Sequence, residues 1–482
     1  MLNYFYVFCD KLLVKKSKYY YIMFFEKSWY YMAKYELDMT SGNLFKKIVV
    51  YTIPIILTGV LQLLYNAADV AVVGQFAGTE ALAAVGSTGS LINLIVSLFL
   101  GLSVGSSVSY ARSIGKGDLE RANRVVHTAV LVSIIASLFL TGIGIVFAKD
   151  FLLMMDSPED VVDLATVYMQ IYFGGMIFNL LYNFASSVVR ANGDSKRPLY
   201  ILMISGLLNV GLNLIFVIFL HMSAAGVALA TVASQAFSAI AIMYILIKET
   251  GPLNFSFSKL KIDKDILKEM VYIGLPSGIQ SAFFSISNVI VQKSVNGFGS
   301  TVIAGNSTAS NLEGFVHVSM NSVYQSTLNF TSQNYGAKKE ENLKKVLIYS
   351  LGIVTVVGLV LGSVFYLLEP YLARFYTSDV DVIKYALNRM QFVCLLYFLC
   401  GIMDVLVGFL RGVGYSTIPM IVSLIGVCAF RVGWIYTIFE SKKTLSSLYI
   451  SYPISWTITV VVLICCILAF YPKIKRKMHS TN

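Results

Sequence analysis

The sequence predicts an all-α integral membrane protein, in which twelve transmembrane helices form two pseudo-symmetric six-helix lobes around a central cavity. Three observations support this prediction: an apolar composition, twelve apolar segments with alternating connections, and an internal repeat. Of the 482 residues, 57% are hydrophobic and only 13% are charged, which is too apolar for a soluble chain of this length. The bilayer is therefore the expected solvent for most of the chain.

Each of the twelve apolar segments is long enough to cross a bilayer, because one crossing needs about 20 residues. The expected spans are 47–75, 82–111, 122–148, 159–188, 198–220 and 223–248, followed by 267–296, 302–332, 343–368, 381–410, 416–438 and 446–471. We divide the chain into an N-terminal extension (1–43), a first lobe (44–248), a linker (249–265), a second lobe (266–471) and a basic tail (472–482). Residues 1–38 are interpreted as a cytoplasmic extension or a misassigned start.

Basic connections alternate with bare or acidic connections along the chain. The basic set includes Lys46 and Lys47 before the first span, Arg112 and Lys116 after the second, and the tail over 472–482. The positive-inside rule places these connections in the cytoplasm, so we predict a multi-pass plasma-membrane protein with both termini cytoplasmic. The net charge of +11 is spread over these connections and not gathered on one soluble face, so no nucleic-acid partner is expected.

The two halves of the chain are related by an internal repeat. The pattern R-x-x-G-x-S-x-x-P occurs at Arg190–Pro198 and again at Arg411–Pro419, an offset of 221 residues (411 minus 190). The same offset carries Gly115 onto Gly336 and Gly78 onto Gly299. Because each half has an even number of crossings, the halves share one orientation and face each other across an axis along the membrane normal. Two such lobes enclose a cavity whose access alternates when they rock, so this arrangement predicts a transporter.

The repeated pattern is interpreted as an architectural corner between two helices. Its Gly permits the turn and its Pro begins the next helix. Its Arg, at positions 190 and 411, is expected at the cytoplasmic end, where it meets helix carbonyls and lipid phosphates. We do not predict a substrate role for either Arg.

A carboxylate lies in the middle of the first span. Gln62, Asn66 and Asp69 recur at helical spacing and share one face of the segment 61–74. A carboxylate facing lipid is costly, and ionisable residues at this depth usually serve a function. Asp69 is therefore the leading functional candidate, and the alternative is a structural carboxylate hydrogen-bonded to Asn and Tyr neighbours.

Several ordered motifs together resemble the multidrug and toxic compound extrusion (MATE) family. They are Met39–Leu44 followed by Pro54, Tyr65–Gly74, Gly101–Gly105 leading to Ala111–Gly115, Asn209 with Asn213, Ala225–Gln235, Gln333–Ala337 and the two R-x-x-G corners. The resemblance covers residues 39–471 in unbroken order. It implies a transporter and not an enzyme, with no cofactor, that exports amphipathic, mostly cationic organic compounds in exchange for sodium ions or protons. The partners implied are small organic cations and the lipid bilayer, and we expect a monomer.

The resemblance also implies a cation-coupling site in the first lobe. In the DinF-like branch, the coupling residues correspond to Asp69, Asn209, Asn213 and Thr231 of this chain, and Asp69 and Asn209 are candidate ligands for a monovalent cation. Asn213 stands where that branch has a second carboxylate, so Asp69 is the only acid in the set. The alternative role of both Asn residues is hydrogen bonding between helices, and that of Thr231 is packing.

Further polar residues of the first lobe are candidates for the substrate cavity. Asn179 and Asn183 lie one helical turn apart, and Gln170 is considered beside them. The predicted cavity residues are Gln62, Tyr65, Asn66, Tyr172, Asn179 and Asn183.

In the second lobe, three ionisable residues fall inside apolar spans. They are Glu313, Asp404 and Arg431, and we favour a structural pairing of Glu313 or Asp404 with Arg431 over a substrate role. The NorM-like branch has a carboxylate in the seventh helix, but Leu275–Val295 contains none, so coupling is expected only in the first lobe.

The sequence fits other functional classes less well. A flippase for lipid-linked oligosaccharide or peptidoglycan precursor is the nearest alternative, and it would need both Lys293 and Arg431 in the central cavity. An integral membrane enzyme is disfavoured because the four His residues are scattered and unpaired by spacing. ATP-driven transport is disfavoured because the sequence contains no phosphate-binding loop. A regulator or scaffold that transports no substrate would not account for two related lobes and a carboxylate buried in one of them.

Overall fold

The computed structural model describes residues 36–155, 159–377 and 379–480. The chain divides into the units Met1–Leu37 and Asp38–Asn482, and the fold described below is that of the second unit. The predicted extension over 1–38 therefore lies almost entirely outside the described residues.

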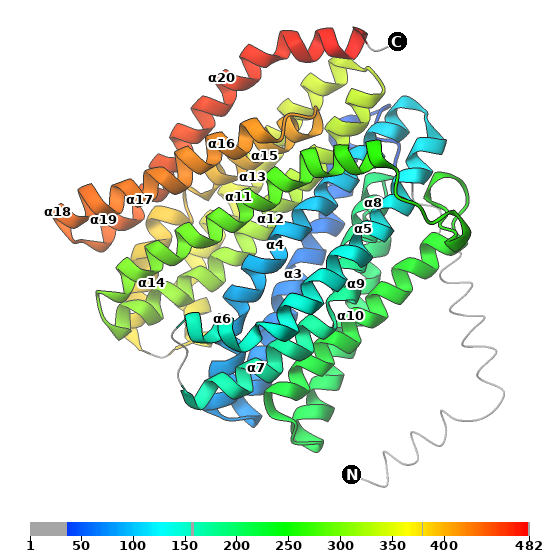
Figure 1. Cartoon of the computed structure of the whole chain (residues 1–482). Helices are drawn as coiled ribbons and strands as arrows, with labels where there is room; N and C mark the ends of the chain where they lie inside the picture. The colour runs from blue at the N-terminus through cyan, green and yellow to red at the C-terminus, as the bar shows by residue number, and fades with distance from the viewer. Residues whose placement is uncertain (1–35, 156–158, 378, 481–482) are drawn as a thin grey trace. The chain divides into compact units, whose positions relative to one another are not determined.

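The first lobe comprises the helices before the linker. They are α3 (Leu44–Phe76), α4 (Thr79–Lys116), α5 (Leu119–Val146), the short α6 (Ala148–Met154), α7 (Glu159–Gly174), α8 (Met176–Ala191), α9 (Lys196–Asn213), the π-helix η1 (Leu214–Phe219) and α10 (Ser223–Lys248). Figure 1 shows these helices in blue to green. The short 3-10 turns η2 (Gly251–Leu253) and η3 (Phe257–Lys259) follow in the linker.

The second lobe begins at α11. Its elements are α11 (Lys264–Asn296), α12 (Ser300–Gly336), α13 (Glu340–Leu372), η4 (Ala373–Phe375), α14 (Val380–Val393), α15 (Tyr397–Gly412), α16 (Thr417–Ser423), η5 (Leu424–Ala429), α17 (Phe430–Trp434), η6 (Ile435–Phe439), α18 (Glu440–Lys442), α19 (Leu445–Tyr449) and α20 (Ser451–Ser480).

Most of these helices have the length and composition of membrane spans. Within the described residues, eight helical segments qualify singly, and the pairs α7 with α8 and α14 with α15 each qualify as one span bent by 46° and 45°. Helices α11 and α12 are longer than a bilayer crossing, at 33 and 37 residues, although they carry more polar residues. Each expected span thus coincides with one helix or one bent pair.

The internal repeat is visible in the backbone. The bend after Gly174 in the first lobe corresponds to the bend after Val393 in the second. The two R-x-x-G corners turn at Gly193 (φ 104°) and Gly414 (φ 94°), a left-handed conformation that favours glycine. At the first corner, Asp194 accepts hydrogen bonds from the backbone N–H groups of Lys196 (3.0 Å) and Arg197 (3.1 Å), which begins α9.

The predicted contacts of Arg411 at the second corner, helix carbonyls and lipid phosphates, were wrong. Arg411 is buried and donates hydrogen bonds to the Tyr324 hydroxyl (2.7 Å) and to Gln280 (2.8 Å), so it does not reach lipid phosphates. The backbone carbonyl of Gly412 instead accepts hydrogen bonds from Arg112 of the first lobe (3.0 Å). The corner therefore connects the two lobes as well as two helices.

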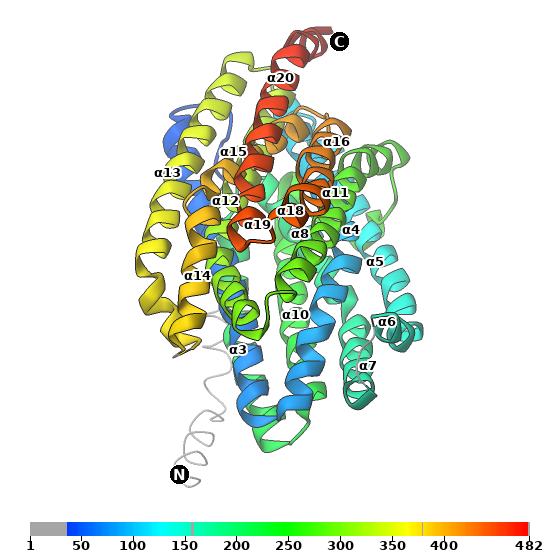
Figure 2. The same ribbon diagram turned by 90° about the vertical axis from the view of Figure 1, so that its left-hand side faces the viewer.

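The lobes meet through α4 and α11, which lie side by side in both views (Figures 1 and 2). A Cβ atom on Gly101 of α4 would lie 2.6 Å from the Gly274 carbonyl oxygen and 2.6 Å from the Gly278 Cα atom of α11. The missing side chains let the two backbones touch, as small residues do at helix contacts in membranes. Gly105 of α4 makes the same kind of contact with the Met270 backbone, one turn closer to the basic connections.

Polar contacts between the lobes lie at the end of the helices that carries the basic connections. Glu269 of α11 accepts hydrogen bonds from Arg112 (3.1 Å), Arg121 (2.9 Å) and Ser109 (2.9 Å) of the first lobe. Asn329 of α12 bonds Ser107 of α4 (2.7 Å) and Tyr51 of α3 (2.9 Å). The lobes are therefore joined at the basic end.

The segment before α3 also joins the lobes. The backbone carbonyl of Thr40 accepts hydrogen bonds from Lys339 (2.7 Å) and Asn342 (2.8 Å), and that of Met39 accepts one from Asn334 (2.8 Å). Although burial raises it, hydrogen bonds from Ser41 and Thr40 bring the pKa of Asp38 down to about 2. Asp38 is thus ionised at neutral pH, and its hydrogen bonds with Thr40 and Ser41 stabilise this turn.

The linker lies against the first lobe. The Phe255 ring stacks on His127 of α5 (centroids 5.2 Å apart), and the backbone N–H of Ser256 donates to His127 Nε2 (3.1 Å). Asn123 of α5 donates to the carbonyl of Asn254 (2.6 Å). These contacts attach most of the linker to α5 and leave little free length before α11.

We expect the α4 to α11 contact to be sensitive to a single methyl group. Gly101→Ala forces the two backbones apart and should destabilise the protein by about 1–3 kcal/mol, which is typical of overpacking. Gly86→Ala is the matched control on the same helix, because a Cβ there meets nothing within 4 Å; it should be neutral or stabilising by up to about 1 kcal/mol. Thermal unfolding of the purified variants in detergent measures the difference, and equal midpoints would contradict the close contact.

Candidate functional site

Asp69 lies at the meeting point of three helices of the first lobe. Its carboxylate on α3 accepts hydrogen bonds from the side-chain amide of Asn213 on α9 and from the Thr231 hydroxyl on α10 (3.5 Å). Asn213 also donates to Asn209 Oδ1, one turn earlier on α9 (3.3 Å). The structure thus brings together all four side chains of the predicted coupling set.

Asn213 occupies a special position in the backbone. It is the last residue of α9, and the π-helix η1 begins directly after it. Such π-helical turns occur often at functional sites because they redirect side chains within a helix. Asn213 is 0% exposed, and its Oδ1 atom has no hydrogen-bond partner within the described residues. A buried oxygen without a donor is costly unless a cation, proton or water meets it.

The donors of this cluster suit a small hard cation. Asp69 supplies a carboxylate, Asn209 and Asn213 supply amide oxygens and Thr231 supplies a hydroxyl oxygen, which are the oxygen types that hard cations prefer. No group of three or more His, Cys, Asp or Glu side chains that could hold a metal ion occurs in the described part of the chain. With one carboxylate, the cluster matches one monovalent cation or one proton.

The other polar residues near Asp69 on α3 do not join this cluster. Tyr65 packs its ring against Gly206 of α9 and donates to the Met203 carbonyl (3.3 Å), so it holds α3 on α9. Gln62 and Asn66 are exposed on the surface of α3. Of the three, Tyr65 is placed by packing, whereas Gln62 and Asn66 remain accessible.

The remaining predicted cavity residues lie on α7 and α8. Asn183 donates to the Asn179 side chain (3.2 Å) and backbone (2.8 Å), so this pair is bonded to itself. The Tyr172 ring stacks on Tyr168 with centroids 6.4 Å apart. Gln170 instead donates to the carbonyl of Ile145 on α5 (3.2 Å) at an exposed position.

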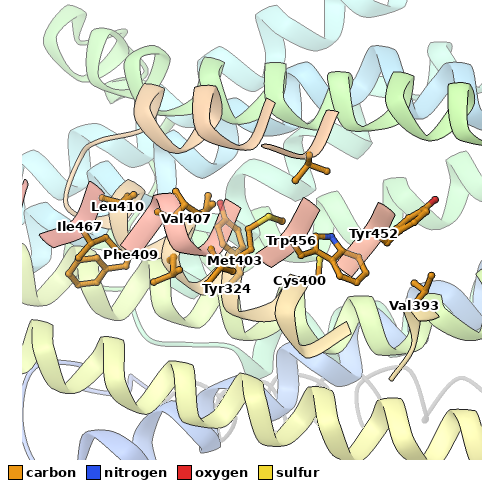
Figure 3. Close-up of a cluster of buried hydrophobic side chains, with 14 of the residues drawn as sticks. Tyr324, Val393, Cys400, Met403, Val407, Phe409, Leu410, Tyr452, Trp456 and Ile467 are labelled. Atoms are coloured by element: carbon orange, nitrogen blue, oxygen red, sulfur yellow. The ribbon is translucent and has the colours of Figure 1, made fainter. Parts of the chain in front are cut away.

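A cavity of 360 Å³ lies in the second lobe. Its lining is Phe284, Ser287, Asn288, Val291, Gln292, Ser310, Glu313, Gly314, His317, Arg389, Val393, Tyr397, Cys400, Met403, Asp404, Val427, Arg431, Tyr452 and Trp456. Some of these lining residues are labelled in Figure 3, where Cys400 of α15 lies beside the ring of Trp456 of α20. The four charged residues of the lining come from α12, α14, α15 and α17.

The predicted partner of Arg431 was wrong. Glu313 forms a two-point pair with Arg389 (3.0 Å to Nε and 2.8 Å to Nη2), and both side chains are less than a tenth exposed. Arg389 also donates to Asn306 (2.7 Å). Arg431 instead donates to the Ser455 hydroxyl (3.0 Å) and lies over the ring of Tyr452 (4.0 Å to the centroid). The pairing follows from the side-by-side packing of α12 and α14, which sequence patterns did not reveal.

Arg389 is the residue that sequence reasoning missed. It lies within the expected span 381–410, and its charge inside an apolar segment was the signal that could have found it. Asp404, from the same span, has no hydrogen bond or ion pair in the described residues and faces the cavity. Lys293 is exposed and does not line the cavity.

A family model decides the identity of the chain. The MatE model matches residues 54–215 and again residues 276–437, which together make up more than half of the chain and reproduce the internal repeat. The chain belongs to the MatE family. This confirms the predicted MATE membership and makes the protein a membrane transporter and not an enzyme.

Similar proteins support this assignment. The "Probable multidrug resistance protein YoeA" of Bacillus subtilis (strain 168) is 25% identical over 451 residues, which cover 92% of this chain and 96% of that protein. The "FAD transporter" of Shewanella oneidensis is 24% identical over 334 residues, which cover 68% of this chain and 74% of that protein.

A solved structure shows the same fold. It is described as the outward-facing conformation of a multidrug resistance MATE family transporter of the MOP superfamily. It has a TM-score of 0.85 at 23% identity and covers 92% of this chain and 99% of that one. The predicted all-α, twelve-helix, two-lobed fold is therefore confirmed.

Removing one partner of the Glu313 and Arg389 pair should strongly destabilise this MATE protein. Glu313→Gln leaves the buried guanidinium without a counter-charge, and such a loss typically costs about 3–5 kcal/mol. Asp163→Asn is the control, since its pair with Lys149 (2.9 Å) is exposed and should contribute less than about 1 kcal/mol. Unfolding midpoints in detergent test this expectation, and equal small shifts for both variants would argue against a structural pair.

Proposed function

We propose that the protein is a secondary active efflux antiporter that exports amphipathic, mostly cationic organic compounds in exchange for sodium ions or protons. The observation that carries the proposal is the Asp69 cluster, in which one carboxylate contacts Asn213 and Thr231 inside a transmembrane lobe and Asn213 in turn bonds Asn209. The name of the relative YoeA, a probable multidrug resistance protein, supports multidrug export as the activity. The positions of Asp69, Asn209 and Thr231 agree with the DinF-like branch, which we retain as part of the proposal, and the chain departs from that branch at Asn213.

The exchange follows from competition for one negative charge. An ionised Asp69 attracts a cationic substrate into the first lobe, where little water screens the charge. A proton or a monovalent cation on Asp69, with the free Asn213 oxygen as a further ligand, removes that attraction. The substrate and the coupling ion then bind in turn, and this difference in affinity drives exchange.

Access to the site is proposed to alternate through motion of the lobes. In this structure, the lobes are joined at the basic end by Glu269, Arg112, Arg121 and the glycine contact of α4 with α11. The positive-inside rule puts this end in the cytoplasm, together with both termini. The proposed state is therefore closed toward the cytoplasm, and release of the Glu269 contacts would open it.

The flippase alternative is not favoured by the side chains of the second lobe. It required Lys293 and Arg431 to face the cavity together, but only Arg431 lines it. The positive charge of Arg389, which also lines this cavity, is matched by Glu313. The name of the relative from Shewanella oneidensis, FAD transporter, points to a different substrate in a similar chain. The cationic class proposed here therefore depends on Asp69 and not on the names of relatives.

Asp69→Asn should abolish energy-coupled efflux while the protein still inserts and folds. The amide cannot hold a proton or neutralise a cation in the same way, so we expect at least a roughly tenfold loss of transport, or about 1.4 kcal/mol of coupling. Efflux of a fluorescent cationic dye from proteoliposomes, with sodium and pH gradients imposed separately, gives the measurement and identifies the ion.

The matched control is Asp150→Asn, which changes an exposed carboxylate of α6. It should transport as the unaltered protein does. Undiminished dye transport by Asp69→Asn at equal protein level would contradict the proposed competition of substrate and coupling ion for Asp69.

Glu269→Gln should favour opening at the basic end. The change removes the negative charge that holds Arg112 and Arg121 across the lobes, and a loss of about 1.4 kcal/mol would raise the open population about tenfold. Spin labels on cysteines placed at Lys116 and Lys268, both exposed near this end, report the distance between the lobes by electron resonance. Glu341→Gln, which alters an exposed pair within α13, should leave the distance distribution unchanged. If the distance distribution is also unchanged in Glu269→Gln, the contacts of Glu269 with Arg112 and Arg121 do not control opening at the basic end.

A further inference from the structure

Helix α20 continues past its membrane span. Its first part, up to Tyr471, has about 20 residues and so spans about 30 Å, which is the thickness of the hydrocarbon core of a bilayer. The helix then passes Pro472 and runs on to Ser480. Figure 1 shows that this end of α20 turns away from the direction of the rest of the helix. The part over 472–480, which we call the terminal segment, therefore lies at the level expected for the bilayer surface.

Two faces of the terminal segment attach it to the second lobe. Ile474 and Met478, one helical turn apart, are 1% and 2% exposed and belong to the hydrophobic core of that lobe. On the neighbouring face, the Lys475 ammonium lies 3.1 Å from the Glu340 carboxylate of α13, and the Tyr471 hydroxyl donates to the same carboxylate (3.4 Å). The segment is thus held in place, and its remaining face points in a fixed direction.

The remaining face is basic and exposed. Lys473, Arg476 and Lys477 follow each other at helical spacing, which places them on one side of the segment. Arg476 forms no hydrogen bond or ion pair with any residue that the structure describes. The Lys473 ammonium lies over the Phe470 ring (5.3 Å to the centroid). Residues 472–482 contain no acid, so the segment itself does not neutralise this charge.

The basic face continues the lipid-facing side of the same helix. Val462, Ala469 and Arg476 follow each other at intervals of seven residues, so they lie nearly in line along α20. Val462 and Ala469 are exposed on the span, where the neighbour of an exposed apolar side chain is lipid. Phe470 and Tyr471 lie at the boundary, a level at which aromatic rings often contact headgroups. One side of α20 therefore meets lipid tails first and presents positive charge where headgroups follow.

We propose that the terminal segment of α20 is a docking surface for anionic phospholipids, whose headgroup phosphates pair with Lys473, Arg476 and Lys477. Basic side chains beside a membrane span attract anionic lipids, and the planar guanidinium of Arg fits a phosphate with two parallel hydrogen bonds. Because Ile474 and Met478 attach the segment to the core of the second lobe, a bound lipid holds this end of the lobe at the membrane surface.

This inference goes beyond the proposed antiport and beyond the topology of the chain. The positive-inside rule states on which side of the membrane basic residues stay, whereas the docking surface gives three of them a ligand. No residue of the Asp69 cluster takes part, so the two proposals stand or fall separately.

Binding of defined lipids to the purified full chain tests the surface. The probes are phosphatidylglycerol, which is anionic, and phosphatidylcholine with the same acyl chains, which is zwitterionic. Native mass spectrometry of the protein in detergent counts the bound lipids and gives a dissociation constant for each. We expect the unaltered protein to bind phosphatidylglycerol at least about tenfold more tightly, since each basic residue at a membrane surface contributes about fivefold to the affinity for anionic lipid.

Paired variants locate the binding. Lys473→Gln combined with Arg476→Gln should weaken phosphatidylglycerol at least about tenfold and leave phosphatidylcholine unchanged. The matched control is Lys344→Gln combined with Lys345→Gln, which removes two charges at the same end of the molecule. Those two side chains already pair with glutamates one turn earlier on α13, at 3.8 and 3.7 Å. The control should therefore change the affinity less than about twofold.

A third variant and a fold check separate charge from structure. Lys473→Arg combined with Arg476→Lys keeps both charges and should bind phosphatidylglycerol as the unaltered protein does. Both side chains are exposed, so unfolding midpoints in detergent should be the same for all variants. Equal affinity of the unaltered protein for the two lipids, or an equal loss in the two glutamine pairs, would overturn the inference.

Two competitors test the kind of ligand. Glycerol 3-phosphate, a soluble headgroup without acyl chains, should not displace phosphatidylglycerol at equal concentration. If it does, the segment binds small anions in general and the assignment to lipid is wrong. A polyglutamate peptide that displaces the lipid would instead point to an acidic protein partner and contradict the proposal. Because the binding is measured without an ion gradient, its failure leaves the Asp69 mechanism untouched.

Discussion

The contact between α4 and α11 is the constraint on which the arrangement of the two lobes depends. Gly101, Gly274 and Gly278 allow the backbones to touch, and no larger side chain fits between them. This close approach brings Glu269 within hydrogen-bonding distance of Arg112 and Arg121 at the basic end. In a bilayer, where burying apolar surface gives little gain between helices, such packing and polar contacts supply most of the attraction between lobes.

The two lobes handle buried charge in different ways. The first lobe has one carboxylate, Asp69, and meets it with amide and hydroxyl groups that carry no charge. The second lobe contains two acids and two arginines around one cavity, and it pairs Glu313 with Arg389 while Arg431 and Asp404 remain apart. A neutral polar cluster suits an ion that comes and goes, whereas a full ion pair suits a wall that stays in place.

Much of the fold could be predicted from the sequence, because the bilayer imposes long apolar segments and the repeat fixes their grouping. The corner glycines 193 and 414 illustrate this, since their spacing alone indicated equivalent turns. The side chains around Asp69 were named through resemblance to a family and not through spacing. The pairing in the second lobe was not predictable, because the choice between Arg389 and Arg431 as the partner of Glu313 depends on how α12 packs against α14 and α17. A one-dimensional pattern contains no information on that choice, although Arg389 itself could have been recognised as a charge inside an apolar span.

Helices α3 and α12 connect the Asp69 cluster of the first lobe to the cavity of the second lobe. Gly59 of α3 lies against Val318 of α12, so closely that a Cβ atom on Gly59 would overlap that side chain. Asp69 lies further along α3, and Glu313 and His317 of the second-lobe cavity lie on α12 next to Val318. Pro54 interrupts the hydrogen bonding of α3 one turn before Gly59. The packing of α3 against α12 thus connects the helix that carries Asp69 to the helix that carries Glu313. Because packed interfaces shift between discrete arrangements and do not deform gradually, a displacement of either helix at this contact must move the other.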